Sequence, residues 1–222
     1  MSLNILAIET ATAVCSVAIR IDNQKPRELR QIGTGIHSEM VFVFTEKLLN
    51  QSKAKLANLD GIVLSAGPGS YTGLRVGSSA VKGMLFGSNV SFYAAHTLSG
   101  IAWGANKAYP NIRNIHAVLD ARRKHLYHQS FEFEQNLINA KEENSIKPLS
   151  EFSSMIKNGD LIAGTGIERL PAEITNNTPI IGEDCISALH LIDLFDLSVK
   201  PNGQILSHHI KKVALEEFEP YY

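Results

Sequence analysis

The sequence predicts an α/β protein built from two similar lobes. Three observations lead to this prediction. Three strand-like segments open the chain, strands and helices then alternate, and the second half repeats this order with shorter elements. No sequence-level repeat or low-complexity tract interrupts the pattern. We expect an N-terminal lobe over residues 1–107 and a reduced C-terminal lobe over residues 108–222.

The first half reads as three strands followed by alternating helices and strands. Its short apolar runs are bounded by turn residues, as in the hairpin-like connection Asp22-Asn-Gln-Lys-Pro26. We expect strands over residues 3–9, 13–21, 26–33, 60–65 and 90–94. We expect helices over residues 37–51, 73–87 and 97–107. Ser38 and Thr72 are the expected N-caps of the first two helices, because hydroxyl oxygens accept hydrogen bonds from free helical N–H groups.

The second half has the same alternation in shorter elements. We expect strands over residues 114–119, 125–133, 161–163 and 179–181. We expect a short helix over residues 150–158 and an amphipathic helix over residues 185–197. The polar stretch 136–144 is typical of a loop or an exposed hairpin.

Composition restricts the class of protein. The 222 residues carry a formal net charge of −1, which argues against a primary RNA binder because phosphate neutralisation supplies most RNA affinity. No apolar run approaches the ~18 residues of a membrane span, and we expect no secretory signal. Two cysteines, Cys15 and Cys185, indicate reduced thiols. We therefore expect a cytoplasmic protein without a membrane association.

The most informative segment is a glycine-rich turn, Ala66-Gly-Pro-Gly-Ser-Tyr-Thr-Gly-Leu-Arg-Val-Gly77, between an apolar strand and a helix. Such a turn can direct free backbone N–H groups at an anion or a partner. A Walker A loop is excluded, because the residues after Gly73 are not Lys and Ser/Thr. A nucleophile elbow is excluded as well, because no glycine stands two residues before or after Ser70.

This turn is one of a series of segments that together resemble the TsaB (YeaZ) family, bacterial proteins needed for the threonylcarbamoyladenosine modification of tRNA. The resemblance covers nearly the whole chain. It implies the actin-like ATPase (ribonuclease H-like) fold with a reduced second lobe. Besides the turn, the segments that carry it are Asn4–Ile19, His37–Glu39, Leu59–Leu64, Ala94–Gly100, Val118–Arg123, Gly159–Gly164 and His209–Glu216.

The resemblance also indicates which chemistry is missing. The catalytic relatives of this family, the TsaD (Gcp, Kae1) proteins, bind a metal through His-x-x-x-His on a helix, which places both imidazoles on one face. Here His96 is followed by Gly100 at the second position. His125 and His128 do not replace this pair, because residues three apart on a strand point to opposite faces. We therefore predict no metal site and no catalytic residue.

The first turn, Glu9-Thr-Ala-Thr12, matches the position where actin-like ATPases hold an aspartate and hydroxyls near nucleotide phosphates. The family usually reads Asp-Thr-Ser-Thr, so two of the four residues differ. We expect no cofactor, although weakly bound or interface-shared ADP or ATP stays open. The candidate phosphate contacts are Thr10, Thr12, Gly69, Ser70 and Thr72.

A second charged segment, Asp120 with Arg122 and Arg123, stands at a strand end. It is interpreted either as an anion-binding turn or as a solvated turn.

Two helices have the composition of an interface. The helix 37–51 contains five consecutive apolar residues, and the helix 73–87 contains small residues that allow close helix approach. Two such pairs could form a four-helix interface burying more than ~1,200 Å². The resemblance implies that this pair joins TsaB to TsaD and also forms TsaB homodimers. The expected contacts are Met40, Val41, Phe44, Leu74, Gly77, Val81 and Met84.

The resemblance therefore predicts a non-catalytic partner subunit that binds and activates TsaD, with the TsaE ATPase joining them. The complex modifies adenosine 37 of tRNA, and this chain contacts tRNA only through the complex. Alone, it is expected to form a homodimer. Two alternatives stay open: a small metal-independent hydrolase or glycoprotease-like peptidase using Ser70 or His96, and a nucleotide-binding regulatory module.

Overall fold

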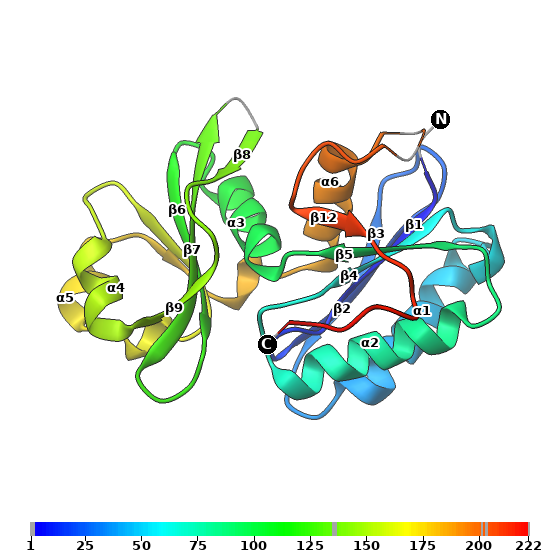
Figure 1. Ribbon diagram of the computed structural model, residues 1–222, viewed down its shortest axis with the longest axis horizontal. Helices are drawn as coiled ribbons and strands as arrows, with labels where there is room; N and C mark the ends of the chain where they lie inside the picture. The colour runs from blue at the N-terminus through cyan, green and yellow to red at the C-terminus, as the bar shows by residue number, and fades with distance from the viewer. Residues whose placement is uncertain (1–2, 135–136, 201, 203, 222) are drawn as a thin grey trace. The chain divides into compact units, whose positions relative to one another are not determined.

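The computed structural model describes residues 3–134, 137–200, 202 and 204–221. The chain forms two compact units (Figure 1). Unit 1 combines Met1–Thr97 with Ser187–Tyr222, and unit 2 comprises Leu98–Ile186. A mixed β-sheet forms the centre of each unit. No helix in the described part of the chain is long and apolar enough to cross a membrane.

The sheet of unit 1 has the strand order β12-β5-β4-β1-β2-β3. Strands β1, β2 and β3 form an antiparallel meander, β4 and β5 extend it in parallel from β1, and β12 pairs antiparallel with β5. The central strands are buried along their whole length, which explains their nearly continuous apolar sequences. The bounds are β1 Ile5–Glu9, β2 Val14–Arg20, β3 Arg27–Ile32, β4 Gly61–Ser65, β5 Ser91–Ala95 and β12 Ile210–Lys212.

Helices cover both faces of this sheet. Figure 1 shows α1 (His37–Gln51) and α2 (Tyr71–Leu85) on one side and α6 (Ala188–Ser198) on the other. The core between the sheet and the first two helices contains Leu6, Ile8, Val17, Val41, Leu48, Leu64, Val81 and Leu85. A short 3₁₀ turn, Leu56–Asn58, precedes β4.

Two of the expected helix caps were wrong. Helix α2 begins at Tyr71, and its N-cap is Ser70, whose hydroxyl accepts a hydrogen bond from the Gly73 N–H at 3.3 Å, whereas Thr72 is exposed inside the first turn. Helix α1 begins at His37 without any side-chain cap, so Ser38 does not cap it.

The division of the chain differs from the expected boundary after residue 107. The structure places α6 and β12 in unit 1, although both fall within the range expected for the second lobe. Helix α6 packs on β1, β2 and β4, and its Phe195 ring meets Tyr93 edge to face at 4.9 Å between centroids. Ile210 of β12 pairs with Ala95 at the edge of the sheet. These long-range contacts leave no periodic signal in the sequence.

The sheet of unit 2 has the order β11-β10-β6-β7-β8, and β9 pairs with the other end of β7. The polar stretch 136–144 contains β8 and is therefore a strand pairing with β7, although residue 136 lies outside the described residues. Helix α5 and strand β9 were not expected, because both are short. The strands are β6 Asn114–Asp120, β7 His125–Glu134, β8 Leu137–Ala140, β9 Ser145–Pro148, β10 Leu161–Gly164 and β11 Ile180–Ile181. The helices are α3 Thr97–Ala108, α4 Leu149–Met155 and α5 Ala172–Asn177, with 3₁₀ turns at Ile167–Arg169 and Glu183–Cys185.

Two histidines form a buried pair in unit 2. His116 Nδ1 lies 3.0 Å from His128 Nε2, and His116 Nε2 lies 3.1 Å from Asp160 Oδ2. The Phe152 ring packs edge-on against both imidazoles. Burial lowers the pKa of both histidines, that of His128 to about 3. His125 is exposed, which confirms that it and His128 do not share a face.

This pair predicts acid sensitivity of the fold. Because the pKa of folded His128 (about 3) lies below its ordinary value of 6.5, the unfolded chain binds this proton first as the pH falls. The free energy of unfolding should therefore decline between pH 6.5 and 3, with a slope of about 1.4 kcal/mol per pH unit for each such histidine. Urea titrations at several pH values should show a shallower decline in His128→Asn. The matched variant of exposed His125, His125→Asn, should keep the wild-type slope; equal slopes in all three proteins would contradict the assignment.

Candidate functional site

The glycine-rich turn packs directly on the turn between β1 and β2. The Ser70 N–H donates to the Ala11 carbonyl at 2.7 Å. A Cβ on Gly69 would lie 2.4 Å from the Ala11 carbonyl oxygen, and one on Gly73 would lie 2.1 Å from the Thr10 carbonyl oxygen. These positions require glycine because two backbones touch there.

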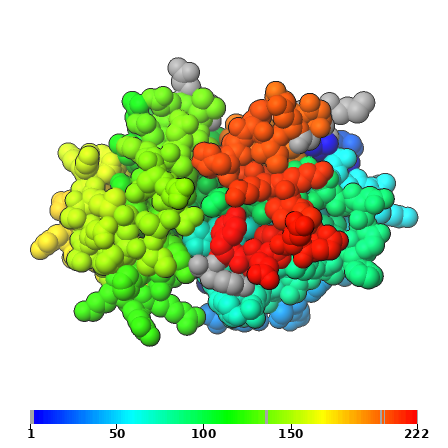
Figure 2. Space-filling model, in the orientation of Figure 1, coloured from blue at the N-terminus to red at the C-terminus, as the bar shows by residue number. Residues whose placement is uncertain are grey.

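The other side of the turn is fixed by segments distant in sequence. The Gly67 N–H donates to Thr97 Oγ1 at 3.1 Å, and the Tyr221 N–H donates to the Ala66 carbonyl at 2.9 Å. Gly67 has a φ of +120° and lies against the Tyr221 backbone, so a side chain would not fit there. Figure 2 shows the C-terminal segment, in red, on the surface of unit 1 beside α2. The turn is thus enclosed by its own chain.

The β1–β2 turn contains a buried carboxyl group. Glu9 Oε1 accepts a hydrogen bond from the Ala11 N–H at 2.6 Å. Burial raises the pKa of Glu9 from 4.5 to about 7. Thr10 is fully buried, and its Oγ1 has no hydrogen-bond partner among the described residues. Thr12 Oγ1 accepts from the Val14 N–H at 3.1 Å.

The five candidate phosphate contacts are therefore not presented together on an open surface. Thr10, Gly69 and Ser70 meet where the two turns pack, and Thr12 caps its own turn. Of the five, Ser70 and Thr72 are exposed, Gly69 is half-buried, and Thr10 and Thr12 are buried. In this conformation the Ser70 N–H is used by the Ala11 carbonyl, and Gly69 and Gly73 lie against the backbone of the β1–β2 turn. Nucleotide contact at these residues stays a prediction.

The remaining candidate chemical groups are not joined into a reactive site. The His96 ring lies 5.3 Å from the Tyr221 ring, and burial together with Lys211 and His208 lowers its pKa. Ser70 uses its hydroxyl as a helix cap, and no hydrogen bond connects it to His96 within the described residues. Asp120 pairs instead with Arg169 in unit 2. The described residues contain no group of three His, Cys, Asp or Glu side chains that could hold a metal ion.

The predicted interface residues of α1 and α2 fall into two groups. Val41, Leu74 and Val81 are 0% exposed, and Gly77 is buried against Thr10 and Leu64. Full burial of one such aliphatic side chain contributes about 1.5–3 kcal/mol to folding, so these four positions belong to the core and not to the outer surface. In this conformation these four residues are not accessible to a partner, and their contact with one stays a prediction. The other group, Met40, Phe44 and Met84, is partly buried at the margin of the same core.

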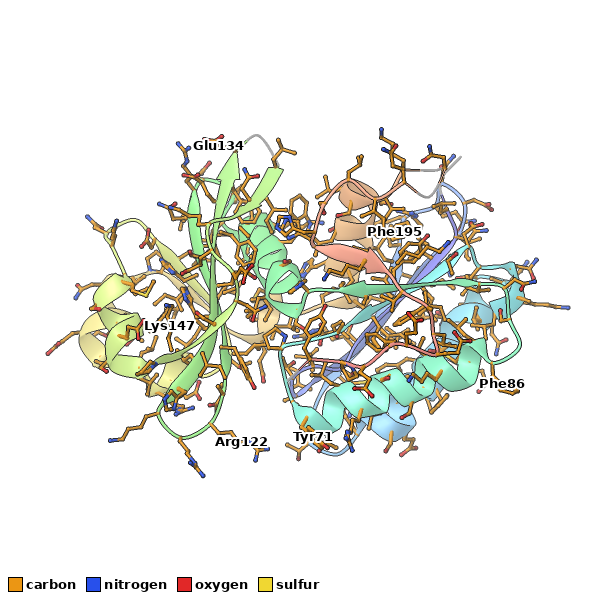
Figure 3. The ribbon with its side chains drawn as sticks, viewed as in Figure 1. Tyr71, Phe86, Arg122, Glu134, Lys147 and Phe195 are labelled. Carbon is orange, nitrogen blue, oxygen red and sulfur yellow. The ribbon has the colours of Figure 1, made fainter. Side chains whose placement is uncertain are left out.

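Other apolar side chains of these helices do face solvent. Phe42 is 51% exposed and Val43 is 43% exposed on α1. Tyr71 and Phe86, labelled in Figure 3, are exposed at the two ends of α2, Phe86 at 91%. Phe42 and Val43 belong to the apolar run of α1 that the sequence shows, but a run of five apolar residues cannot indicate which of them face outward. We define the α1 patch as Phe42 and Val43.

The packing of the glycine-rich turn predicts a large difference between two glycines of α2. Gly73→Ala should destabilise the fold by about 1–3 kcal/mol, because the new methyl group would overlap the Thr10 carbonyl. Gly83→Ala is the matched control, since a Cβ there meets nothing within 4 Å, and alanine in an exposed helix should stabilise by about 0.5–1 kcal/mol. Thermal unfolding monitored by circular dichroism measures both. Equal melting temperatures for the two variants would show that the turns are not in close contact.

Comparison with known proteins identifies the relatives of this chain. Residues 31–213 match the family model described as TsaD, tRNA N6-adenosine threonylcarbamoyltransferase. The tRNA threonylcarbamoyladenosine biosynthesis protein TsaB of Escherichia coli is 28% identical over 99% of this chain and 94% of its own length. TsaB of Haemophilus influenzae is 29% identical, over 57% of this chain and 52% of its own length. The match to this second relative therefore spans about half of either protein.

Solved structures show the same fold. YeaZ from Pseudomonas aeruginosa superposes with a TM-score of 0.79 at 20% identity, and the alignment covers 100% of both chains. A second Pseudomonas aeruginosa protein, described as similar to peptidase YeaZ, superposes with a TM-score of 0.83 at 22% identity. The two mixed sheets with their flanking helices agree with the actin-like (ribonuclease H-like) ATPase fold. From the family match and these relatives, the chain belongs to the TsaD family and, within it, to the TsaB (YeaZ) group.

Proposed function

We propose that this chain is a non-catalytic partner subunit of a complex that makes threonylcarbamoyladenosine in tRNA. It binds and activates a TsaD-type catalytic protein, and a TsaE-type ATPase joins the pair. The observation that carries this proposal is the closed glycine-rich turn. Where an enzyme of this fold would hold phosphate, the Ser70 N–H and hydroxyl are already used by the Ala11 carbonyl and the Gly73 N–H.

Several features support a role without catalysis. His96 stands without a second histidine, because Gly100 occupies the position one helical turn later. A serine hydroxyl needs an adjacent general base to accept its proton before it acts as a nucleophile, and Ser70 has no hydrogen bond to such a base within the described residues. We therefore favour the partner subunit over the peptidase alternative.

The α1 patch supports the contact with a protein partner. Phe42 and Val43 expose apolar surface on a helix whose opposite side is anchored in the core through Val41 and Leu48. Exposed apolar groups on a rigid element are typical of protein–protein contacts, where burial contributes about 25 cal/mol per Å². A second copy of this chain presents the same patch, so we propose that the free protein pairs with itself through α1 and exchanges that copy for the TsaD-type protein.

A charge placed in the α1 patch should prevent this association. Phe42→Glu should weaken binding to the TsaD-type protein of the same organism at least about tenfold, since burial of a phenylalanine contributes about 1.5–3 kcal/mol. Co-purification and biolayer interferometry measure the effect. Ile146→Glu on β9 is the control, because Ile146 is 56% exposed and belongs to unit 2. Wild-type affinity in Phe42→Glu would exclude the α1 patch as the contact.

Substitution of Ser70 and His96 separates a partner subunit from a hydrolase. Ser70→Ala should cost about 1 kcal/mol of stability through loss of the helix cap. Below the melting temperature, Ser70→Ala and His96→Ala should each support threonylcarbamoyladenosine formation by the reconstituted complex within about threefold of wild type. Mass spectrometry of digested tRNA measures the product. Loss of product by more than a hundredfold in a folded variant would favour the hydrolase.

A further inference from the structure

Three consecutive cationic residues lie at the tip of the hairpin that joins β6 to β7 in unit 2. Arg122, Arg123 and Lys124 are all exposed, and Figure 3 labels Arg122 at the free end of the hairpin. None of the three side chains has a hydrogen bond or ion pair within the part of the chain that the structure describes. Three neighbouring positive charges therefore have no acidic partner of their own.

The backbone of this tip has an unusual conformation for these residues. Arg122 has a φ of +66° and Arg123 a φ of +52°, both in the left-handed region that favours glycine, asparagine and aspartate. Such residues cost energy and cluster at functional sites. A turn that served only to reverse the chain would be more stable with glycine at either position.

The tip is held rigidly from both sides. Asp120 Oδ1 accepts from the Arg122 N–H at 2.7 Å, and the His125 N–H donates to the Arg122 carbonyl at 3.2 Å. The Leu149 N–H donates to the Lys124 carbonyl at 3.0 Å. Gly166 packs against Asp120 at the start of the hairpin, where a Cβ on the glycine would lie 3.2 Å from Asp120 Cα. These hydrogen bonds hold the backbone that carries the three cationic side chains.

The local charge of the tip is positive. Asp120 is the nearest acidic residue in sequence, and its carboxylate forms an ion pair with Arg169. That pair is neutral as a unit and leaves the three cations uncompensated. The whole chain has a formal net charge of −1, so the tip is a local concentration and not part of a generally basic surface.

The chemistry of the tip fits phosphates better than a protein partner. Guanidinium groups bind phosphate oxygens through two parallel N–H bonds, and adjacent cations suit a polymer of phosphates. Protein contacts of high affinity usually contain a buried apolar or aromatic anchor. No large apolar side chain is exposed between Asp120 and His125, all of which the structure describes.

We propose that the hairpin tip Arg122–Lys124 binds backbone phosphates of the RNA that the complex modifies. This inference rests on the proposed function, because the chain alone is not basic enough to be a primary RNA binder. Within the complex the tip adds three phosphate contacts to those of the catalytic subunit. It positions the RNA without reading its sequence.

The test uses the complex of full-length chain and TsaD-type protein, with an unmodified tRNA transcript as the probe. The variant is Arg122→Gln/Arg123→Gln/Lys124→Gln. Its RNA affinity at ~0.1 M salt should fall about 10- to 100-fold. The slope of log affinity against log salt should become shallower by about two to three. The matched control, Lys25→Gln/Lys157→Gln/Lys212→Gln, removes the same charge from three exposed lysines spread over the chain, and should keep the wild-type affinity and slope.

Each outcome is decisive once equal melting temperatures establish that the variants are folded. Equal losses of RNA affinity in variant and control, or none in either, overturn the inference and leave the proposed function intact. Loss of association with the TsaD-type protein in the hairpin variant would assign the tip to a protein partner and also overturn it. Failure of the wild-type chain to associate with that protein would overturn the proposed function and the RNA contact together.

Discussion

In unit 1 the glycine-rich turn and the β1–β2 turn are in direct backbone contact, and the position of α2 depends on it. A hydrogen bond of 2.7 Å from Ser70 to Ala11 joins them, and glycines stand where any Cβ would overlap a carbonyl oxygen. Because α2 starts directly after this contact, its position and rotation on the sheet are fixed by it. Helix α1 packs against α2, so the outward direction of Phe42 and Val43 depends on the same contact.

The same contact also occupies hydrogen-bonding groups of the glycine-rich turn. A glycine-rich turn before a helix has N–H groups that could bind an anion, but here the chain supplies its own carbonyl and hydroxyl acceptors. Glu9 lies beneath this junction as a buried carboxyl whose pKa is raised to about 7 by desolvation. In this conformation the glycine-rich turn anchors the start of α2 to the β1–β2 turn.

The two surfaces that support the proposed role differ in chemistry. The α1 patch in unit 1 is apolar and suits a dry protein contact. The hairpin tip in unit 2 is cationic and lacks exposed large apolar side chains. In the proposed role the first surface would contact a protein and the second would contact phosphates.

Apolar runs, turn residues and the Ala66–Gly77 motif are local signals, and they were enough to predict the α/β class, the family and most elements of both sheets. The place of α6 and β12 in unit 1 could not be predicted in this way, since the pairing of Ile210 with Ala95 joins segments more than a hundred residues apart. The same holds for the exposed residues of α1. In the unbroken apolar run from Met40 to Phe44, the rotation of α1 against the sheet buries Val41 and exposes Phe42, and no periodicity in the run can reveal that rotation.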